Sequence, residues 1–309
     1  MSEFSLIAQH FSRHQATNDI AISVGDDCAV VDVPVGQQLV ICTDTMVANR
    51  HYPSDTPAHA IGHKAVAVNL SDISAMGATP HSITLALSLP SYDAAWVADF
   101  ADGLYQICDR YGIKLIGGDT TYAPTTTISV TAVGYIPKHQ AITRHGAMVG
   151  DVICVSGHVG SASFALSQIL QNQPSQLRDK LDYPEPQVAL GQALRGYAHS
   201  MIDISDGLGQ DLGHILAASC VSARLDLDKI PCHTLLEHLP FTQKYQHILN
   251  GGDDYQLCFT MNKEKFAQFQ ANFPHFSIYA IGEIVADGGV QLFEHGQAVA
   301  FDIKGFEHF

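Results

Sequence analysis

Short acidic turns are spread over most of this chain, and their residue types suit one kind of chemistry. Each turn places an Asp beside Gly, Ser or Thr, mostly where an apolar run ends or a helical pattern begins. The turns are Gly25-Asp26-Asp27, Thr43-Asp44-Thr45, Asn69-Leu70-Ser71-Asp72, Gly117-Gly118-Asp119, Asp203-Ile204-Ser205-Asp206 and Gly251-Gly252-Asp253-Asp254. Protein sites for Mg²⁺ use oxygen ligands, usually a few carboxylates together with substrate phosphates. Because the chain also lacks a G-x-x-x-x-G-K-[ST] loop, the turns indicate a polyphosphate that is held through metal ions.

Each acidic turn also has a simpler explanation, since Asp is common in turns and at the N-caps of helices. Six such turns in one acidic chain favour the metal interpretation. Two unit charges 4 Å apart repel by about 4 kcal/mol at an effective dielectric near 20, so a cluster of carboxylates needs a cation. In the first half of the chain, the candidates that neighbouring strand ends could bring together are Asp27, Thr43, Asp44, Asp72 and Asp119.

The composition narrows the class of protein. Acidic residues number 31 and basic residues 16, and the net charge of −15 argues against nucleic-acid or anionic-membrane surfaces. Hydrophobic residues make up 46% and charged residues 15%, as in globular domains. There is no apolar run of roughly 18 residues and no signal-peptide pattern. The seven cysteines are scattered without C-x-x-C spacing, so we expect a soluble protein of the reducing cytoplasm.

The apolar periodicity predicts strands and helices that alternate in two α/β units. Helices are expected at 4–11, 58–76, 94–111, 162–170, 191–197, 206–218 and 263–272. Strands are expected at 28–33, 39–43, 83–89, 114–116, 126–136, 151–155, 201–204, 223–227, 256–259 and 278–284. The polar stretch 171–186 contains three prolines and is expected to be a loop. A linker at 137–150 would join an N-terminal domain, residues 1–138, to a C-terminal domain, residues 150–309.

Two further segments could bind phosphate. In Val155-Ser156-Gly157-His158-Val159-Gly160-Ser161 a strand runs through two glycines into a helix, and such a loop can offer backbone N–H groups to an anion. The same pattern also occurs in ordinary strand–helix connections. Arg144 precedes a glycine turn, where it is either a phosphate clamp or a solvated charge.

In order and in spacing, these motifs resemble the thiamine-monophosphate kinase family over nearly the whole chain. The resemblance runs through Gly25-Asp26-Asp27-Cys28-Ala29, Thr43-Asp44-Thr45, Asn69-Leu70-Ser71-Asp72, Ile116-Gly117-Gly118-Asp119-Thr120, Asp203-Ile204-Ser205-Asp206-Gly207-Leu208 and Gly251-Gly252-Asp253-Asp254-Tyr255. The wider superfamily includes aminoimidazole ribonucleotide synthetase and selenophosphate synthetase. The opening Glu3-Phe4-Ser5-Leu6-Ile7 and the closing Gly305-Phe306-Glu307-His308-Phe309 favour the thiamine branch.

The resemblance implies a fold and a reaction. The fold would be α/β (α+β), with two domains of the aminoimidazole ribonucleotide synthetase-like type. The N-terminal domain would close a shared β-barrel with its copy in a homodimer, and the C-terminal domain would be an open sheet with helices on one face. ATP and thiamine monophosphate would give ADP and thiamine diphosphate. Transfer would be direct and in line, with several Mg²⁺ ions and no catalytic nucleophile on the protein. Neither nucleic acid nor membrane is implied as a partner.

The resemblance also assigns residues to roles. Metal ligands would be Asp27, Cys42, Thr43, Asp44, Asp72, Asp119, Asp203 and Asp206. ATP would contact Gly118, Asp119, Arg144 and Ser205, and thiamine monophosphate would contact His51, Asp253 and Phe306.

Three positions depart from the family pattern. Cys42 stands where Ser or Thr is usual, Asp253 replaces Glu, and Phe306 replaces a frequent Trp. Two other functions stay open: a related ATP-dependent ligase that acts on a different acceptor, and a regulatory protein that binds metal or nucleotide without catalysis.

Overall fold

A computed structural model describes residues 3–13, 17–25 and 27–305 of the chain. The chain divides into two compact units, Met1–Ile73 with Ala78–His139 and Ser74–Gly77 with Gln140–Phe309. Each unit contains its own sheet and its own helices. The mixed α/β class expected from the sequence is therefore confirmed.

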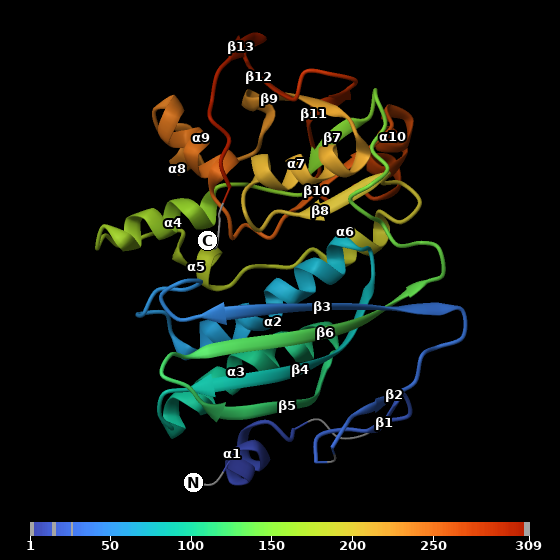
Figure 1. Ribbon diagram of the computed structural model, residues 1–309. Coiled ribbons are helices and arrows are strands. Elements are labelled where there is room, and N and C mark those ends of the chain that lie inside the picture. The colour runs from blue at the N-terminus through green and yellow to red at the C-terminus, as the bar shows by residue number, and fades with distance from the viewer. Residues whose placement is uncertain (1–2, 14–16, 26, 306–309) are drawn as a thin grey trace. The chain divides into compact units, whose positions relative to one another are not determined.

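A four-stranded sheet with the order β3-β6-β4-β5 forms the centre of the first unit. Its strands are β3 (Gln37–Val47), β4 (Thr79–Leu89), β5 (Lys114–Tyr122) and β6 (Thr127–Pro137). β6 pairs antiparallel with β3 and β4, whereas β4 and β5 are parallel. The helices α2 (Ala58–Ala75) and α3 (Ala94–Tyr111) cover one face of the sheet (Figure 1). The unit also contains α1 (Glu3–His10), β1 (Ile20–Ile22) and β2 (Val30–Val31).

The local sequence explains where α3 begins and ends. The carboxylate of Asp93 accepts hydrogen bonds from two backbone N–H groups of the first turn, as an N-cap does. Gly112 ends the helix with φ 67°, a left-handed conformation that favours glycine. Between them Val97, Phe100 and Leu104 recur at helical spacing and are fully buried against the sheet.

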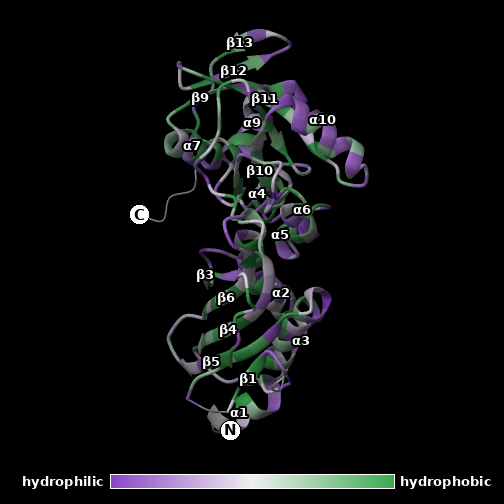
Figure 2. Ribbon diagram, turned by 90° about the vertical axis from the view of Figure 1, so that its right-hand side faces the viewer, coloured by the Kyte–Doolittle hydropathy of each residue, from purple (hydrophilic) through white to green (hydrophobic). Residues whose placement is uncertain are grey.

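The opposite face of this sheet carries no helix among the described residues of the first unit (Figure 2). Successive side chains of a strand point to opposite faces. On β3 the odd-numbered residues therefore face away from the helices, and Leu39 and Ile41 are 46% and 60% exposed. Thr43 and Thr45 lie on the same outer face.

The second unit is built on a seven-stranded sheet with the order β13-β12-β9-β11-β7-β10-β8. Its strands are β7 (Val152–Val155), β8 (Ser200–Asp203), β9 (Ser222–Asp226), β10 (Leu257–Met261), β11 (Tyr279–Val285), β12 (Val290–Glu294) and β13 (Gln297–Val299). Neighbouring strands are antiparallel except for β9 and β12. The helical elements are α4 (Ser161–Leu170), α5 (Arg178–Asp182), α6 (Val188–Ala193), α7 (Leu208–Ser219), η1 (Leu227–Lys229), α8 (Thr234–Glu237), α9 (Phe241–Asn250) and α10 (Lys263–Asn272).

Both faces of the second sheet are covered, so the expectation of helices on one face is wrong. On β7, Ile153 and Val155 pack into an apolar cluster with α4, α7 and α9. Cys154, between them, packs into a second cluster with α6 and α10. Strands that are apolar at every position have two faces to bury, and this sheet meets that requirement with helices on each side.

Several helical segments were not expected, among them α5, α8 and α9. The stretch 171–186, expected to be a loop, contains α5, because Leu177 and Leu181 are both buried in the core of the second unit. α9 was missed altogether, although Tyr245 and Leu249 are fully buried at i, i+4 spacing. No helix in the described part of the chain is long and apolar enough to span a membrane.

Candidate functional site

Asn69 of α2 organises the acidic site of the first unit. It is fully buried, and its Nδ2 donates to the carbonyl oxygen of Ala65 at 3.1 Å. Its Oδ1 accepts the backbone N–H of Asp44 at 3.1 Å, and its carbonyl oxygen accepts the thiol of Cys42 at 3.4 Å. Because β3 is an edge strand of the sheet that the described residues form, the N–H of Asp44 needs a partner from outside this sheet. Asn69 supplies one and thereby fixes β3 against α2.

Asp44 and Asp72 both lie near Cys42. Burial, followed by the charges of Asp72 and Asp44, raises the pKa of the Cys42 thiol well above its ordinary value. The thiol therefore stays protonated at neutral pH and donates to Asn69. A neutral sulfur is a poor ligand for a hard cation, so the oxygens of the two carboxylates are the groups in this cluster that suit Mg²⁺.

Replacement of Cys42 by serine is expected to be tolerated. A serine hydroxyl can donate to the same carbonyl oxygen of Asn69. We expect kcat/KM of Cys42→Ser to stay within about threefold of wild type, as measured by steady-state kinetics. Cys154→Ser is the matched control: Cys154 is fully buried among apolar side chains, so a hydroxyl there should cost about 1–3 kcal/mol of unfolding free energy. A large activity loss in Cys42→Ser would show that the sulfur has a chemical role.

Thr43 is separated from this cluster by the alternation of β3. Its Oγ1 lies 2.8 Å from the Oγ1 of Thr131 on β6, and Thr45 pairs in the same way with Ser129 at 2.7 Å. These hydroxyl pairs lie on the outer face of the sheet, whereas Asp44 faces α2. The structure therefore does not bring the hydroxyl of Thr43 together with the carboxylate of Asp44.

Gly118 and Asp119 lie on β5, the other edge strand of the sheet. Gly118 has φ 152°, and a Cβ there would lie 1.9 Å from the carbonyl oxygen of Leu85, so no other residue fits. Asp119 is exposed and lines a small pocket of ≈ 40 Å³ between α1, β4 and β5. Asp27 is also exposed, in the turn after Val24.

These carboxylates do not form a ready metal cluster. Over residues 3–13, 17–25 and 27–305, no group of three or more His, Cys, Asp or Glu side chains lies close enough to hold a metal ion. Mutual repulsion accounts for such spacing, because unit charges at short range cost several kcal/mol without a cation between them. The carboxylates present can supply oxygen ligands. A complete metal site would also need the cation itself and the phosphate oxygens of a substrate.

His51 lies in the turn that follows β3. Its Nδ1 accepts the backbone N–H of Val47 at 3.0 Å, which assigns the ring proton to Nε2 in the neutral form. Lys64 of α2 is only 2% exposed, and its Nζ donates to the carbonyl oxygen of His51 at 3.4 Å. The sequence did not indicate this contact of Lys64. Its position four residues after the buried Ala60 predicts only that it lies on the buried side of the helix.

Asp211 holds the acidic loop of the second unit. It is 2% exposed, and its Oδ2 accepts the backbone N–H groups of Ser205, Asp206 and Gly207 at 3.0, 3.1 and 3.1 Å. Burial, and then the charge of Asp203, raises the pKa of Asp211 to about 7. The sequence carried one signal for this role, an Asp in the first helical turn after Ser205-Asp206-Gly207.

Asp254 occupies the N-terminus of α4, the place where the glycine loop could offer N–H groups to a phosphate. Its Oδ2 accepts the N–H of Gly160 at 2.6 Å and its Oδ1 that of Ala162 at 3.4 Å. The glycine loop after β7 therefore serves as a structural joint between α4 and the 251–256 loop. The neighbouring Asp253 has φ 69°, its N–H donates to Ser205 O at 2.9 Å, and its Oδ1 accepts the Tyr255 hydroxyl at 2.9 Å.

Asp254 should make stability depend on pH. Burial raises its pKa to about 7, from 3.8 for the ordinary carboxyl, so the folded state holds the proton more tightly. Its contribution is then largest below about pH 4 and is lost as the pH rises toward 7. At 1.36 kcal/mol per pKa unit the change is at most about 4 kcal/mol. Thermal unfolding from pH 4 to 8 should show a steeper fall for wild type than for Asp254→Asn, and parallel curves would contradict the expectation.

Arg144 and Phe306 are the two remaining site residues that the sequence predicted. Arg144 is exposed in the turn that precedes β7. Phe306 lies outside the described residues. Within the first unit, the structure brings together Cys42, Asp44 and Asp72. Within the second, the end of β8 at Asp203 and the following loop with Ser205 and Asp206 meet the loop that carries Asp253.

Comparison with known proteins defines the class and then the branch. AIR synthase related protein matches the chain through its N-terminal domain over residues 25–136 and through its C-terminal domain over residues 148–295. The thiamine-monophosphate kinase of Escherichia coli (strain K12) is 41% identical over 321 residues, which cover 99% of this chain and 98% of that protein. The chain belongs to the AIR synthase related family and, within it, to the thiamine-monophosphate kinases, as the motifs predicted.

Solved structures agree with this assignment. The crystal structure of thiamine-monophosphate kinase from Stenotrophomonas maltophilia K279a has a TM-score of 0.84 and 39% identity, with 96% of each chain covered. A structure of AaThiL complexed with AMPPCP and TMP has a TM-score of 0.79 and 29% identity, with 93% of this chain and 92% of that chain covered. The two-domain fold expected from the sequence is confirmed.

Proposed function

We propose that this protein transfers the γ-phosphoryl group of ATP to thiamine monophosphate and yields thiamine diphosphate, the last step of thiamine diphosphate biosynthesis. The carrying observation is the 41% identity to a thiamine-monophosphate kinase over 99% of the chain. The relative bound to AMPPCP and TMP supports both substrates. The site residues are consistent with this reaction. They offer carboxylate oxygens for metal ions and backbone N–H groups for phosphate, rather than a nucleophile paired with a base.

The reaction needs Mg²⁺ in this proposal, and the donor set fits that ion. Asp44 and Asp72 both lie near the protonated thiol of Cys42 and offer carboxylate oxygens. We assign Asp27, Asp44, Asp72 and Asp119 of the first unit, and Asp203 and Asp206 of the second, as ligands. The hydroxyl of Thr43 lies on the opposite sheet face and Cys42 is a hydrogen-bond donor, so we place neither among the side-chain ligands. When bound, Mg²⁺ would neutralise phosphate charge.

The protein's own residues would bind and orient the substrates. Gly118, Asp119, Arg144 and Ser205 are assigned to ATP, and His51, Asp253 and Phe306 to thiamine monophosphate. Ser205 is pre-oriented by its bond to Asp211, and Asp253 by its bond to Ser205. In-line phosphoryl transfer depends mainly on positioning and charge neutralisation. We therefore propose direct transfer with no phosphorylated enzyme.

A homodimer is the assembly that we propose for this enzyme. No helix of the described residues of the first unit covers the outer face of the first sheet, which exposes Leu39 and Ile41 beside hydroxyl side chains. Pairing with a second copy would bury this face in a shared β-barrel, and two-fold pairing is the commonest soluble assembly. The acidic net charge argues against a nucleic-acid or membrane partner. The seven cysteines are all unpaired, which supports a cytoplasmic location.

A side-by-side phosphate-transfer assay tests the proposed function. Thiamine monophosphate, free thiamine and aminoimidazole ribonucleotide precursors would each be offered with ATP. We expect turnover with thiamine monophosphate, its loss after chelation and its return with Mg²⁺. The acceptor phosphate gives the cations a handle that free thiamine lacks. Equal turnover of free thiamine would overturn the acceptor assignment, turnover of the imidazole precursor would favour the ligase, and ATP binding without any turnover would favour a regulatory protein.

A further inference from the structure

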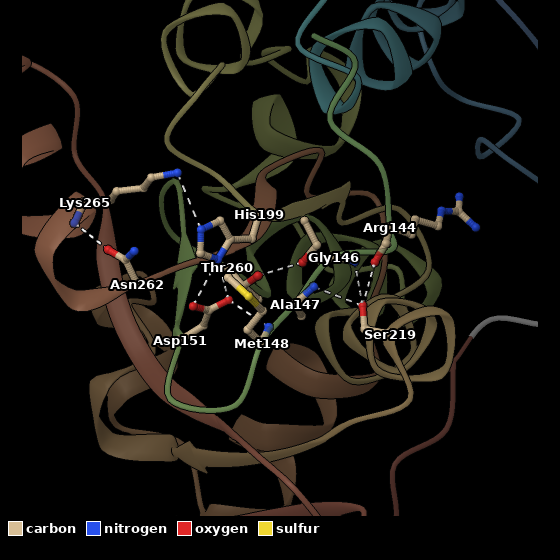
Figure 3. Close-up of polar contacts among 11 residues, drawn as sticks. Arg144, Gly146, Ala147, Met148, Asp151, His199, Ser219, Thr260, Asn262 and Lys265 are labelled. Atoms are coloured by element: carbon tan, nitrogen blue, oxygen red, sulfur yellow. Dashed lines mark hydrogen bonds and ion pairs between the residues drawn. The ribbon is translucent and has the colours of Figure 1, made fainter. Parts of the chain in front are cut away.

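The turn that carries Arg144 is held from several sides within the second unit. The side chain of Arg144 is exposed and extends away from the turn (Figure 3). Gly146 has φ 125°, and a Cβ there would lie 2.4 Å from the carbonyl oxygen of His199, so glycine is required. On the other side, the N–H of Met201 donates to the carbonyl oxygen of Thr143 at 3.0 Å. The backbone around the arginine is therefore tied to β8.

Ser219, the last residue of α7, contacts this turn at three backbone atoms. Its Oγ accepts the N–H groups of Gly146 and Ala147 at 3.1 Å each and donates to the carbonyl oxygen of Arg144 at 3.3 Å (Figure 3). A serine hydroxyl can donate once and accept twice. Ser219 thus commits its whole hydrogen-bonding capacity to the turn.

A buried carboxylate fixes the far end of the same turn. Asp151 is 2% exposed, and its Oδ2 accepts the N–H of Met148 at 2.9 Å and lies 2.9 Å from Nδ1 of His199 (Figure 3). The ring of His199 is in turn 3.5 Å from Nζ of Lys265. Between this end and the bond from Met201 to Thr143, Ser219 is the side chain that holds the backbone at Arg144, Gly146 and Ala147.

α7 links this turn to the acidic loop. Its first turn carries Asp211, which holds the backbone of Ser205, and its last residue is Ser219. Two residues assigned to ATP, Ser205 and Arg144, are therefore held by opposite ends of one 12-residue helix. This arrangement gives Ser219 a role that an ordinary surface serine at a helix end does not have.

We propose that Ser219 is a positioning residue that presents Arg144 to the phosphates of ATP. The proposal rests on the proposed function, in which Arg144 contacts ATP. Ser219 itself touches no substrate. Without its hydroxyl, two N–H groups lose their acceptor and the turn samples more conformations. ATP must then order the turn as it binds, which weakens binding in the ground state and the transition state alike.

Steady-state kinetics of the full-length protein test this role. ATP would be varied at saturating thiamine monophosphate for Ser219→Ala, Ser219→Thr, Arg144→Gln and the double variant Ser219→Ala with Arg144→Gln. Loss of such hydrogen bonds should raise the KM for ATP about 3–10-fold in Ser219→Ala, with kcat within about twofold and the KM for thiamine monophosphate unchanged. Ser219→Thr keeps the hydroxyl and should restore the KM. The control is Ser167→Ala, because Ser167 donates only within its own helix, to Phe164 O.

The double variant distinguishes positioning from general damage. If Ser219 acts through Arg144, adding Ser219→Ala to Arg144→Gln should raise the KM for ATP no further. A normal KM in Ser219→Ala together with a raised KM in Arg144→Gln would overturn the role of Ser219 and leave the proposed function standing. A normal KM in Arg144→Gln would overturn both this proposal and the assignment of Arg144 to ATP. Equal losses for both substrates with a lowered melting temperature would overturn the positioning role in favour of a structural one.

Discussion

Asp44→Asn is expected to lower kcat by about 10²–10³-fold and leave the fold intact. The substitution keeps the shape of the side chain and removes one negative charge. The backbone N–H of residue 44 still donates to Asn69, so β3 keeps its attachment to α2. What is lost is a carboxylate that lies with Asp72 beside Cys42, where we place Mg²⁺.

The stability of Asp44→Asn should move in the opposite direction from its activity. Without a cation the charges of Asp44 and Asp72 repel, so neutralising one of them should leave the melting temperature equal or slightly raised. Asp93→Ala is the matched control in the same unit. It removes the N-cap of α3 and should cost about 0.5–2 kcal/mol of unfolding free energy with little change in kcat. Full activity in Asp44→Asn would remove this carboxylate from the metal site.

Elements with strong local signals could be predicted from the sequence. The helix expected at 94–111 matches α3, because Asp93 and Gly112 mark its ends and its apolar face is regular. The helix expected at 58–76 matches α2 to within one residue. β3 and β5 are longer than expected, since both strands are held along their whole length by pairing with neighbouring strands. α9 was missed because its average hydropathy is low and only its buried stripe carries the signal.

The candidate site was less predictable than the fold. The motifs named the carboxylates but not their partners, since contacts such as Asp44 with Asn69 join residues 25 positions apart. Strand alternation by itself predicts that Thr43 and Asp44 lie on opposite faces of the sheet. The glycine loop before α4 has the pattern of a phosphate-binding loop. In the structure its Gly160 N–H is instead bonded by the carboxylate of Asp254, 94 residues further along the chain. Partners that are this far apart in the sequence cannot be predicted from a local sequence pattern.

Asp211→Ala is expected to reduce kcat/KM by about 10²-fold or more and to lower stability. Three backbone N–H groups, of Ser205, Asp206 and Gly207, would lose their common acceptor inside the protein. Leaving a buried donor unsatisfied costs about 1–3 kcal/mol. The loop would then leave its present conformation, and with it the backbone that positions Ser205 and Asp206 for ATP and metal.

Asp211→Asn separates geometry from charge in this loop. Asn keeps one oxygen that can take the place of Oδ2 but carries no negative charge, so its activity should lie between those of wild type and Asp211→Ala. Amide hydrogen exchange at residues 205–207 should speed up in the same order, which links the lost activity to this loop. Glu283→Gln, which removes only an exposed ion pair with Lys263, should change neither measurement. If Asp211→Ala kept both normal exchange and normal kinetics, the loop would be held by other contacts and Asp211 would have no part in the site.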